Sequence, residues 1–213
     1  QPSTSYRIAK LFYKFLTATP GMTVSFGAPM DVLGNAVNEA GESIDRYGHA
    51  LKLSDYFSFK GQFTVDPQRD AVYTRHLGDA LVSKFHRYNT VLSSHLMAFT
   101  AFQMMRQKFP HFNLYQLLRL PEDEAAVSYT EFAIVVERLR GRLMELYQGK
   151  RLLLAPQFFG FTQKLIAHGL KNMGVYHAKR VLHQVDNSLI ATEDMQLLYY
   201  YRNRLSGYDL EHY

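Results

Sequence analysis

Histidine is the residue most often found in metal sites and in acid–base catalysis, and this sequence contains nine of them. His168, His177 and His183 lie in one region, but spacings of nine and six residues do not place two of them on one helical face. The H-E-x-x-H signature of zinc proteases is absent. We therefore predict no metal site, and we interpret the histidines as surface or core residues.

Nucleophilic catalysis is equally poorly supported. Ser93 and Ser94 precede His95, but adjacent residues rarely act as nucleophile and base, because the base must approach from elsewhere in space. The chain has no cysteine, which excludes disulfides, thiolate catalysis and thiolate zinc sites. It also has no glycine-rich phosphate loop. We predict no catalytic residue and no cofactor.

Several basic residues are candidates for contacts with an anion or a membrane. "RLRGR" places Arg138, Arg140 and Arg142 on a helix near Glu137 and Glu145, which favours a solvated face; contact with anionic lipid or another anion is the alternative. Near the start, Arg7, Lys10 and Lys14 lie opposite an apolar stripe. This first helix either packs on a domain or lies in a membrane interface.

The closing stretch "LLYYYRNRL" predicts a last helix with Arg202 on its apolar face. A guanidinium in such a position needs an acceptor close by. We interpret Arg202 as a structural anchor that pairs with a carboxylate or carbonyl, with contact to a bound anion as the alternative. Tyr201 is expected in the core, with Tyr199 and Tyr200 flanking it or exposed.

The composition is that of a globular protein. Of 213 residues, 47% are hydrophobic and 20% charged, and no apolar run reaches the roughly 18 residues of a membrane-spanning helix. The net charge of +5 favours anionic partners without selecting one. No secretory leader is evident, and the absent initiator methionine suggests a piece of a longer polypeptide.

The elements that must position these residues are mainly helices with short β-strands. We expect the end of a domain over residues 1–27, with a strand at 22–26; a glycine-rich excursion or linker over 28–66; and a helical domain over 67–213. Its helices are predicted near residues 67–88, 95–109, 129–148, 161–174 and 193–206. Ser128 caps the third and Thr192 the last. A hairpin around Asp186-Asn187 gives the end a winged-helix-like order. No internal repeat is expected.

Two long stretches resemble a known family. "MTVSFGAPMDVLGNAVNEAG", followed by "DPQRDAVYTRHLGDALVSKFHRYNTVLSSHLMAFTAF", is similar to the region after the catalytic core of bacterial glycerol-3-phosphate acyltransferases. The stretch "LIAHGLKNMGVYHAKRVLHQVDNSLIATEDMQLLYYYRNRL" resembles that family's C-terminal region, where a helix leads to a strand pair and then to a helix with a Tyr-Tyr-Arg-Asn motif, here Tyr200 to Asn203. The resemblance covers residues 20–205.

The resemblance implies transfer of a fatty acyl group from acyl-CoA or acyl-carrier protein to glycerol 3-phosphate, at the cytoplasmic face of the inner membrane. The family's base is the histidine of an H-x-x-x-x-D motif, but no histidine here has an aspartate five residues later, and Phe-Pro-Glu-Gly is absent. The chain is therefore expected to be an inactive C-terminal part. Residues 1–27 would then be the last helix and strand of the acyltransferase α/β domain, whose catalytic part would lie in cis upstream of Gln1. The isolated fragment would be soluble and peripheral to the membrane. The alternative is a free-standing relative that has lost the enzyme.

Two other classes of function remain open. A winged-helix module would bind nucleic acid through the helix before the wing, but that helix offers only Gln163, Lys164, Lys171 and Asn172, so no nucleic acid is expected as a partner. A module that docks on an anionic membrane surface or on a protein, with no enzymatic domain in cis, is the third hypothesis.

Overall fold

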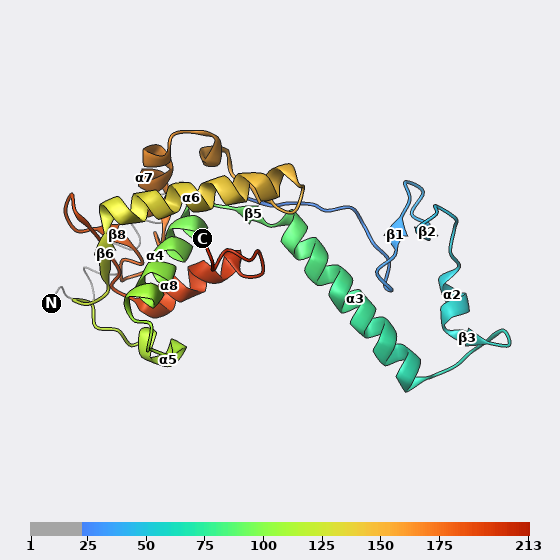
Figure 1. Cartoon of the computed structure of the whole chain (residues 1–213). Coiled ribbons are helices and arrows are strands. Elements are labelled where there is room, and N and C mark those ends of the chain that lie inside the picture. The colour runs from blue at the N-terminus through green and yellow to red at the C-terminus, as the bar shows by residue number, and fades with distance from the viewer. Residues whose placement is uncertain (1–22) are drawn as a thin grey trace. The chain divides into compact units, whose positions relative to one another are not determined.

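The computed structural model describes residues 23–213 (Figure 1). These residues form two compact units: Val24–Asn89, called here the N-terminal unit, and Thr90–Tyr213, called the C-terminal unit. The first helix expected from the sequence lies outside the described residues. Of the strand expected at 22–26, residues 23–26 are described, and they form no strand.

The N-terminal unit combines a long helix with short antiparallel pairs. β1 (Ala36–Val37) pairs with β2 (Ser43–Ile44), and β3 (Ser58–Phe59) pairs with β4 (Gln62–Phe63). Between the two pairs lies the short helix α2 (Leu53–Tyr56). The long helix, α3 (Pro67–Tyr88), begins where the sequence predicts, because the carboxylate of Asp66 accepts hydrogen bonds from the amides of Gln68 and Arg69.

The segment before α2 contains a repeat of seven residues that the sequence analysis missed. Asp31, Asn38 and Asp45 each accept two hydrogen bonds from backbone amides two and four residues further along. A glycine follows each of them three residues later, with φ between 83° and 88°. Each repeat therefore reverses the chain in the same way, and the expectation of no internal repeat is wrong.

The boundary between the units falls at Asn89 rather than near Pro67, because α3 packs against the segment before it. The Ala28 amide donates to the hydroxyl of Tyr88 at 3.1 Å, and the Lys84 ammonium donates to the Ala28 carbonyl at 2.8 Å. Gly34 lies so close to α3 that an added Cβ would stand 3.1 Å from the Cβ of Ala80. Residues 28–66 are thus part of a folded unit, not a linker.

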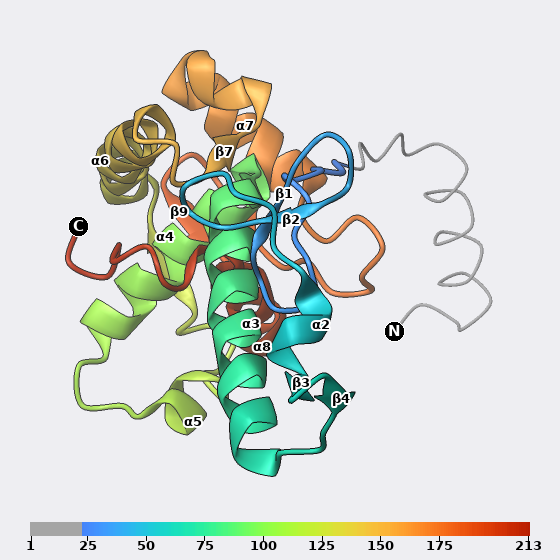
Figure 2. The same ribbon diagram turned by 90° about the vertical axis from the view of Figure 1, so that its right-hand side faces the viewer.

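The C-terminal unit is built around α4 (Ser93–Lys108), most of whose residues are buried. The helices α6 (Tyr129–Gln148), α7 (Thr162–Asn172) and α8 (Met195–Arg202) each pack against α4 (Figure 1, and from the side in Figure 2). Three short helical turns complete the unit: α5 (Leu114–Leu117), η1 (Pro156–Phe159) and η2 (Asn203–Leu205). The buried hydrophobic cluster of the described residues extends from Val91 to Leu210 and so lies wholly in this unit.

The strands of the C-terminal unit are short. β5 (Thr90–Val91) runs parallel to β7 (Leu153–Leu154). β6 (Ala126–Ser128), β9 (Leu189–Ala191) and β8 (His183–Gln184) form an antiparallel sheet in that order, with β9 in the centre. Helix α4, strand β6, helices α6 and α7, and the hairpin β8–β9 follow one another in the order of a winged-helix domain. The expected fold class, mainly α with short β-strands, is confirmed.

Helix ends in this unit follow local chemistry. The Ser128 hydroxyl accepts from the Glu131 amide at the start of α6, as expected, and Gly149 follows the last residue of that helix. The last helix differs, because Asp194 and not Thr192 caps it: its carboxylate accepts from the amides of Gln196 and Leu197. α8 also stops at Arg202, where η2 takes over.

Candidate functional site

Of the basic residues singled out as membrane or anion contacts, Arg7, Lys10 and Lys14 lie outside the described residues. Arg140 and Arg142 are held by carboxylates on the same helix. Arg140 pairs with Glu137 at 3.0 Å, and Arg142 pairs with Glu145 at 2.7 Å. Arg138 faces solvent. The basic run on α6 is therefore largely neutralised by its own helix.

Arg202 is buried on the inner face of α8. Its guanidinium donates to a carboxylate oxygen of Glu211 at 3.1 Å and to the hydroxyl of Ser206 at 3.0 Å. It also lies over the rings of Phe99 and Phe102, at 5.3 and 5.6 Å from their centroids. Arg202 thus links α8, α4 and the C-terminal tail. Tyr201 and Tyr199 are half-buried beside it, whereas Tyr200 is exposed.

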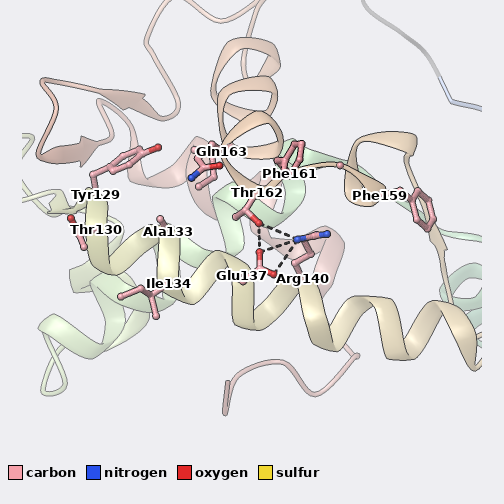
Figure 3. Close-up of a pocket in the computed structure, with 12 residues that line it drawn as sticks. Tyr129, Thr130, Ala133, Ile134, Glu137, Arg140, Phe159, Phe161, Thr162 and Gln163 are labelled. Carbon is pink, nitrogen blue, oxygen red and sulfur yellow. Dashed lines mark hydrogen bonds and ion pairs between the residues drawn. The ribbon is translucent and has the colours of Figure 1, made fainter.

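An open groove of about 810 Å³ runs between the first half of α6 and the segment from η1 into α7 (Figure 3). Helix α6 and the η1–α7 segment each contribute six of the lining residues: Tyr129, Thr130, Ala133, Ile134, Glu137, Arg140, Phe159, Gly160, Phe161, Thr162, Gln163 and Ile166.

Three polar side chains of this groove, those of Glu137, Arg140 and Thr162, hydrogen-bond to one another. Arg140 donates to the carboxylate of Glu137, to the hydroxyl of Thr162 and to the carbonyl of Phe158, and the Thr162 hydroxyl donates to Glu137. Figure 3 shows the three side chains pointing toward one another. The hydroxyl of Thr162 and the charge of Arg140 hold the pKa of the Glu137 carboxyl below its ordinary value. Glu137 is thus an ionised structural link between α6 and α7, unsuited to act as a base at neutral pH.

The rim of the groove is apolar and exposed. The side chain of Phe161 is 73% exposed, that of Ile134 57% and that of Phe159 53%. The ring of Phe159 packs edge-on against Tyr147, with 5.5 Å between the ring centroids. Such side chains outside a core mark a surface that meets another apolar body more often than they mark a catalytic centre.

Within residues 23–213, the serines and histidines of α4 have no carboxylate placed to complete a catalytic triad. The Ser93 hydroxyl lies 2.8 Å from Nδ1 of His168, but the other ring nitrogen of His168 faces the amide of Gln157 and not a carboxylate. Burial, with the nearby charge of Arg204, lowers the pKa of His95 to about 4, and its Nδ1 accepts from the Leu92 amide. These contacts fasten α4 to its neighbours.

Two further properties bear on function. Among the described residues, no three histidine, aspartate or glutamate side chains are placed to share a metal ion. No helix in residues 23–213 combines the length and the apolar character needed to cross a bilayer.

Comparisons with known proteins give no relative: no protein-family model, no curated protein and no solved structure matches the chain. The function of the candidate site is therefore inferred from its geometry. Sequence reasoning missed the exposed pair Phe159 and Phe161 and the link through Thr162. The segment "PQFFGF" carried a signal for the pair, because a proline before the aromatics and a glycine between them indicate a surface turn.

Proposed function

We propose that the chain is the C-terminal accessory region of a glycerol-3-phosphate acyltransferase and is catalytically incomplete by itself. One observation carries the proposal beyond the sequence resemblance. Tyr200, Tyr201, Arg202 and Asn203 lie at the end of the chain's last α-helix, directly after a helix and a strand pair, which is the order that the resemblance implies. Arg202 of this motif binds Glu211 and Ser206, and this supports an architectural role for the motif.

On this proposal the chemistry belongs to a catalytic domain in cis upstream of Gln1. That domain would bind glycerol 3-phosphate and the acyl donor, either acyl-CoA or acyl-carrier protein, and would supply the histidine base. The protein would act at the cytoplasmic face of the inner membrane, with an anionic lipid surface as a partner. The present chain would contribute a rigid helical body and a second unit before it.

An acyl-transfer assay with glycerol 3-phosphate and acyl-CoA tests the proposal. It is run on this chain and on the polypeptide extended upstream of Gln1 in its native reading frame. We expect transfer by the extended form alone. Transfer by neither form would remove the acyltransferase assignment, and transfer by the isolated chain would show that a catalytic site without the H-x-x-x-x-D motif had been overlooked.

The sheet order favours one second candidate, a winged-helix module for nucleic acid. In that reading α7 is the recognition helix, and it exposes Gln163, Lys164, Lys171 and Asn172. The wing, residues 184–189, carries Asp186 and no lysine or arginine, which weakens the candidate. Titration of duplex DNA at two salt concentrations decides it: a nucleic-acid module would bind, and its affinity would fall steeply with salt.

A further inference from the structure

Residues 146–185 contain no aspartate or glutamate but six lysines and arginines. This stretch includes η1, α7 and the approach to β8. Lys179 and Arg180 are paired with Glu122 and Glu193 from outside the stretch. In the part of the chain that the structure describes, the other four, Lys150, Arg151, Lys164 and Lys171, have no carboxylate partner, and all four are exposed.

One of the unpaired cations lies beside an exposed phenylalanine of the groove rim, and the other three lie on the helices that bear the rim or directly after them. Phe161, Lys164 and Lys171 are three and seven residues apart, so they share one face at the start and end of α7. The ammonium of Lys164 lies 5.9 Å from the centroid of the Phe161 ring. Near the end of α6, the ring of Phe159 contacts Tyr147. Lys150 and Arg151 lie in the turn that directly follows α6. We call these six residues the basic aromatic face: Lys150, Arg151, Phe159, Phe161, Lys164 and Lys171.

We propose that the basic aromatic face docks the protein on an anionic lipid surface, with Phe159 and Phe161 entering the headgroup region and the four cations meeting lipid phosphates. Exposed aromatic rings with lysine and arginine around them are typical of surfaces that bind lipid interfaces. Burial of the rings in the interface is favourable, and the negative surface potential attracts the cations. The inference deepens the proposed function and takes from it only the membrane setting.

A lipid surface fits this face better than the other anionic partners do. Phe161 is 73% exposed and Phe159 53% exposed, and a duplex offers such apolar rings little to bind, because its affinity comes mainly from phosphate contacts. The wing beside α7 adds no cation. The arginines of α6, for which lipid contact is the alternative predicted from the sequence, contribute little here, since Arg140 and Arg142 are paired with glutamates.

Vesicle co-sedimentation of the whole 213-residue chain measures the binding. We expect binding to phosphatidylglycerol vesicles, and much weaker binding to phosphatidylcholine vesicles. Lys164→Gln and Lys171→Gln should each lower the affinity about fivefold. Phe161→Ser should lower it about tenfold. The matched control is Phe59→Ser with Lys60→Gln in the N-terminal unit, where a phenylalanine that is 66% exposed also lies beside a lysine.

The absence of tryptophan allows the contact to be localised. Phe161→Trp and Phe59→Trp each give a protein with a single indole at an exposed position, where the larger ring has room. On adding phosphatidylglycerol vesicles, we expect a blue shift of the emission at position 161 and none at position 59. Circular dichroism of both variants before the titration establishes that each is folded.

Three outcomes would overturn the inference. Vesicle binding that survives Phe161→Ser and both lysine substitutions would place the lipid contact elsewhere, for example on Lys10 and Lys14. A blue shift at position 161 with duplex DNA or an acidic carrier protein, but not with vesicles, would assign the face to that partner. No shift with any of them would leave the face without a docking role. None of these readings depends on acyl transfer, so a failure of the proposed function is recognised separately.

Discussion

Arg202 shows how a single charge is accommodated in the core of the C-terminal unit. Its guanidinium is almost fully buried between two aromatic rings of α4 and the tail residues Ser206 and Glu211. The aromatic rings favour the cation, and the carboxylate neutralises it. The two terminal nitrogens of this arginine, an anion-binding candidate in the sequence, thus find their partners within the chain.

Replacing Arg202 with leucine should destabilise the fold by about 2 kcal/mol, because the Glu211 carboxylate and the Ser206 hydroxyl lose a charged donor. Thermal unfolding of Arg202→Leu against the parent chain measures this. Arg138→Leu is the matched control, since Arg138 is exposed on α6, and its melting temperature should stay close to that of the parent. An unchanged melting temperature for Arg202→Leu would instead favour a ligand role for this arginine.

His95 should make the stability of the fold depend on pH. Burial and the charge of Arg204 lower its pKa from 6.5 to about 4, so the folded state holds the neutral ring. The unfolded chain takes up the proton first as the pH falls. The contribution of His95 to the free energy of unfolding is therefore fully present above pH 6.5. It is lost as the pH falls toward 4, which lowers the free energy of unfolding by about 3 kcal/mol.

Urea unfolding of the parent chain and of His95→Gln across this pH range isolates the contribution. The glutamine can still accept from the Leu92 amide but does not titrate, so the decline with falling pH should be shallower in the variant. Parallel curves for the two proteins would show that His95 is not the group responsible.

At the scale of elements, the close approach of α4 and α7 depends on Gly169. A Cβ at this position would stand 2.5 Å from Cγ of Met97 and 3.1 Å from the carbonyl oxygen of Ser93. The same approach brings the Ser93 hydroxyl to His168. Gly141 on α6 is different, because a Cβ there would meet nothing within 4 Å.

Replacing each of these two glycines with alanine should change the stability of the protein in opposite directions. Gly141→Ala should stabilise the protein by about 1 kcal/mol, because alanine favours a helix and its side chain meets no obstacle. Gly169→Ala should destabilise it by about 2 kcal/mol, because Met97 and the α4 backbone must move. Melting temperatures of the two variants give the comparison, and a shift of the same sign in both would contradict the role given to the α4–α7 contact.

Elements with strong local signals were predictable from the sequence. The cap at Ser128 located the start of α6, and the turn at Asp186-Asn187 located the hairpin β8–β9. The seven-residue repeat could have been found, because Asp or Asn followed by Gly three residues later recurs at positions 31, 38 and 45. Its strands are only two residues long, so an alternating pattern does not reveal them. The Thr162–Glu137 link and the packing of α3 on residues 24–66 are tertiary contacts, which periodicity cannot predict.

At the scale of the whole molecule, the C-terminal unit should fold without the rest of the chain. Among residues 23–213, its hydrophobic cluster has no member before Val91. A fragment of residues 90–213 should therefore unfold in one cooperative transition, at a temperature close to that of the same unit in the full chain. Calorimetry of this fragment beside a fragment of residues 67–213 tests where the boundary lies. If fragment 90–213 unfolds in a broad transition and fragment 67–213 in a sharp one, the boundary between the units lies near Pro67 instead.

The strand order of the β6–β9–β8 sheet also predicts the order in which its strands pair during folding. β8 and β9 are neighbours along the chain, whereas Val127 in β6 meets Ile190 in β9 only after both intervening helices have been placed. Closing that larger loop costs more chain entropy, so β6 joins the hairpin late, after the transition state. Val127→Ala should therefore speed unfolding while leaving the refolding rate nearly unchanged, which a chevron plot would reveal.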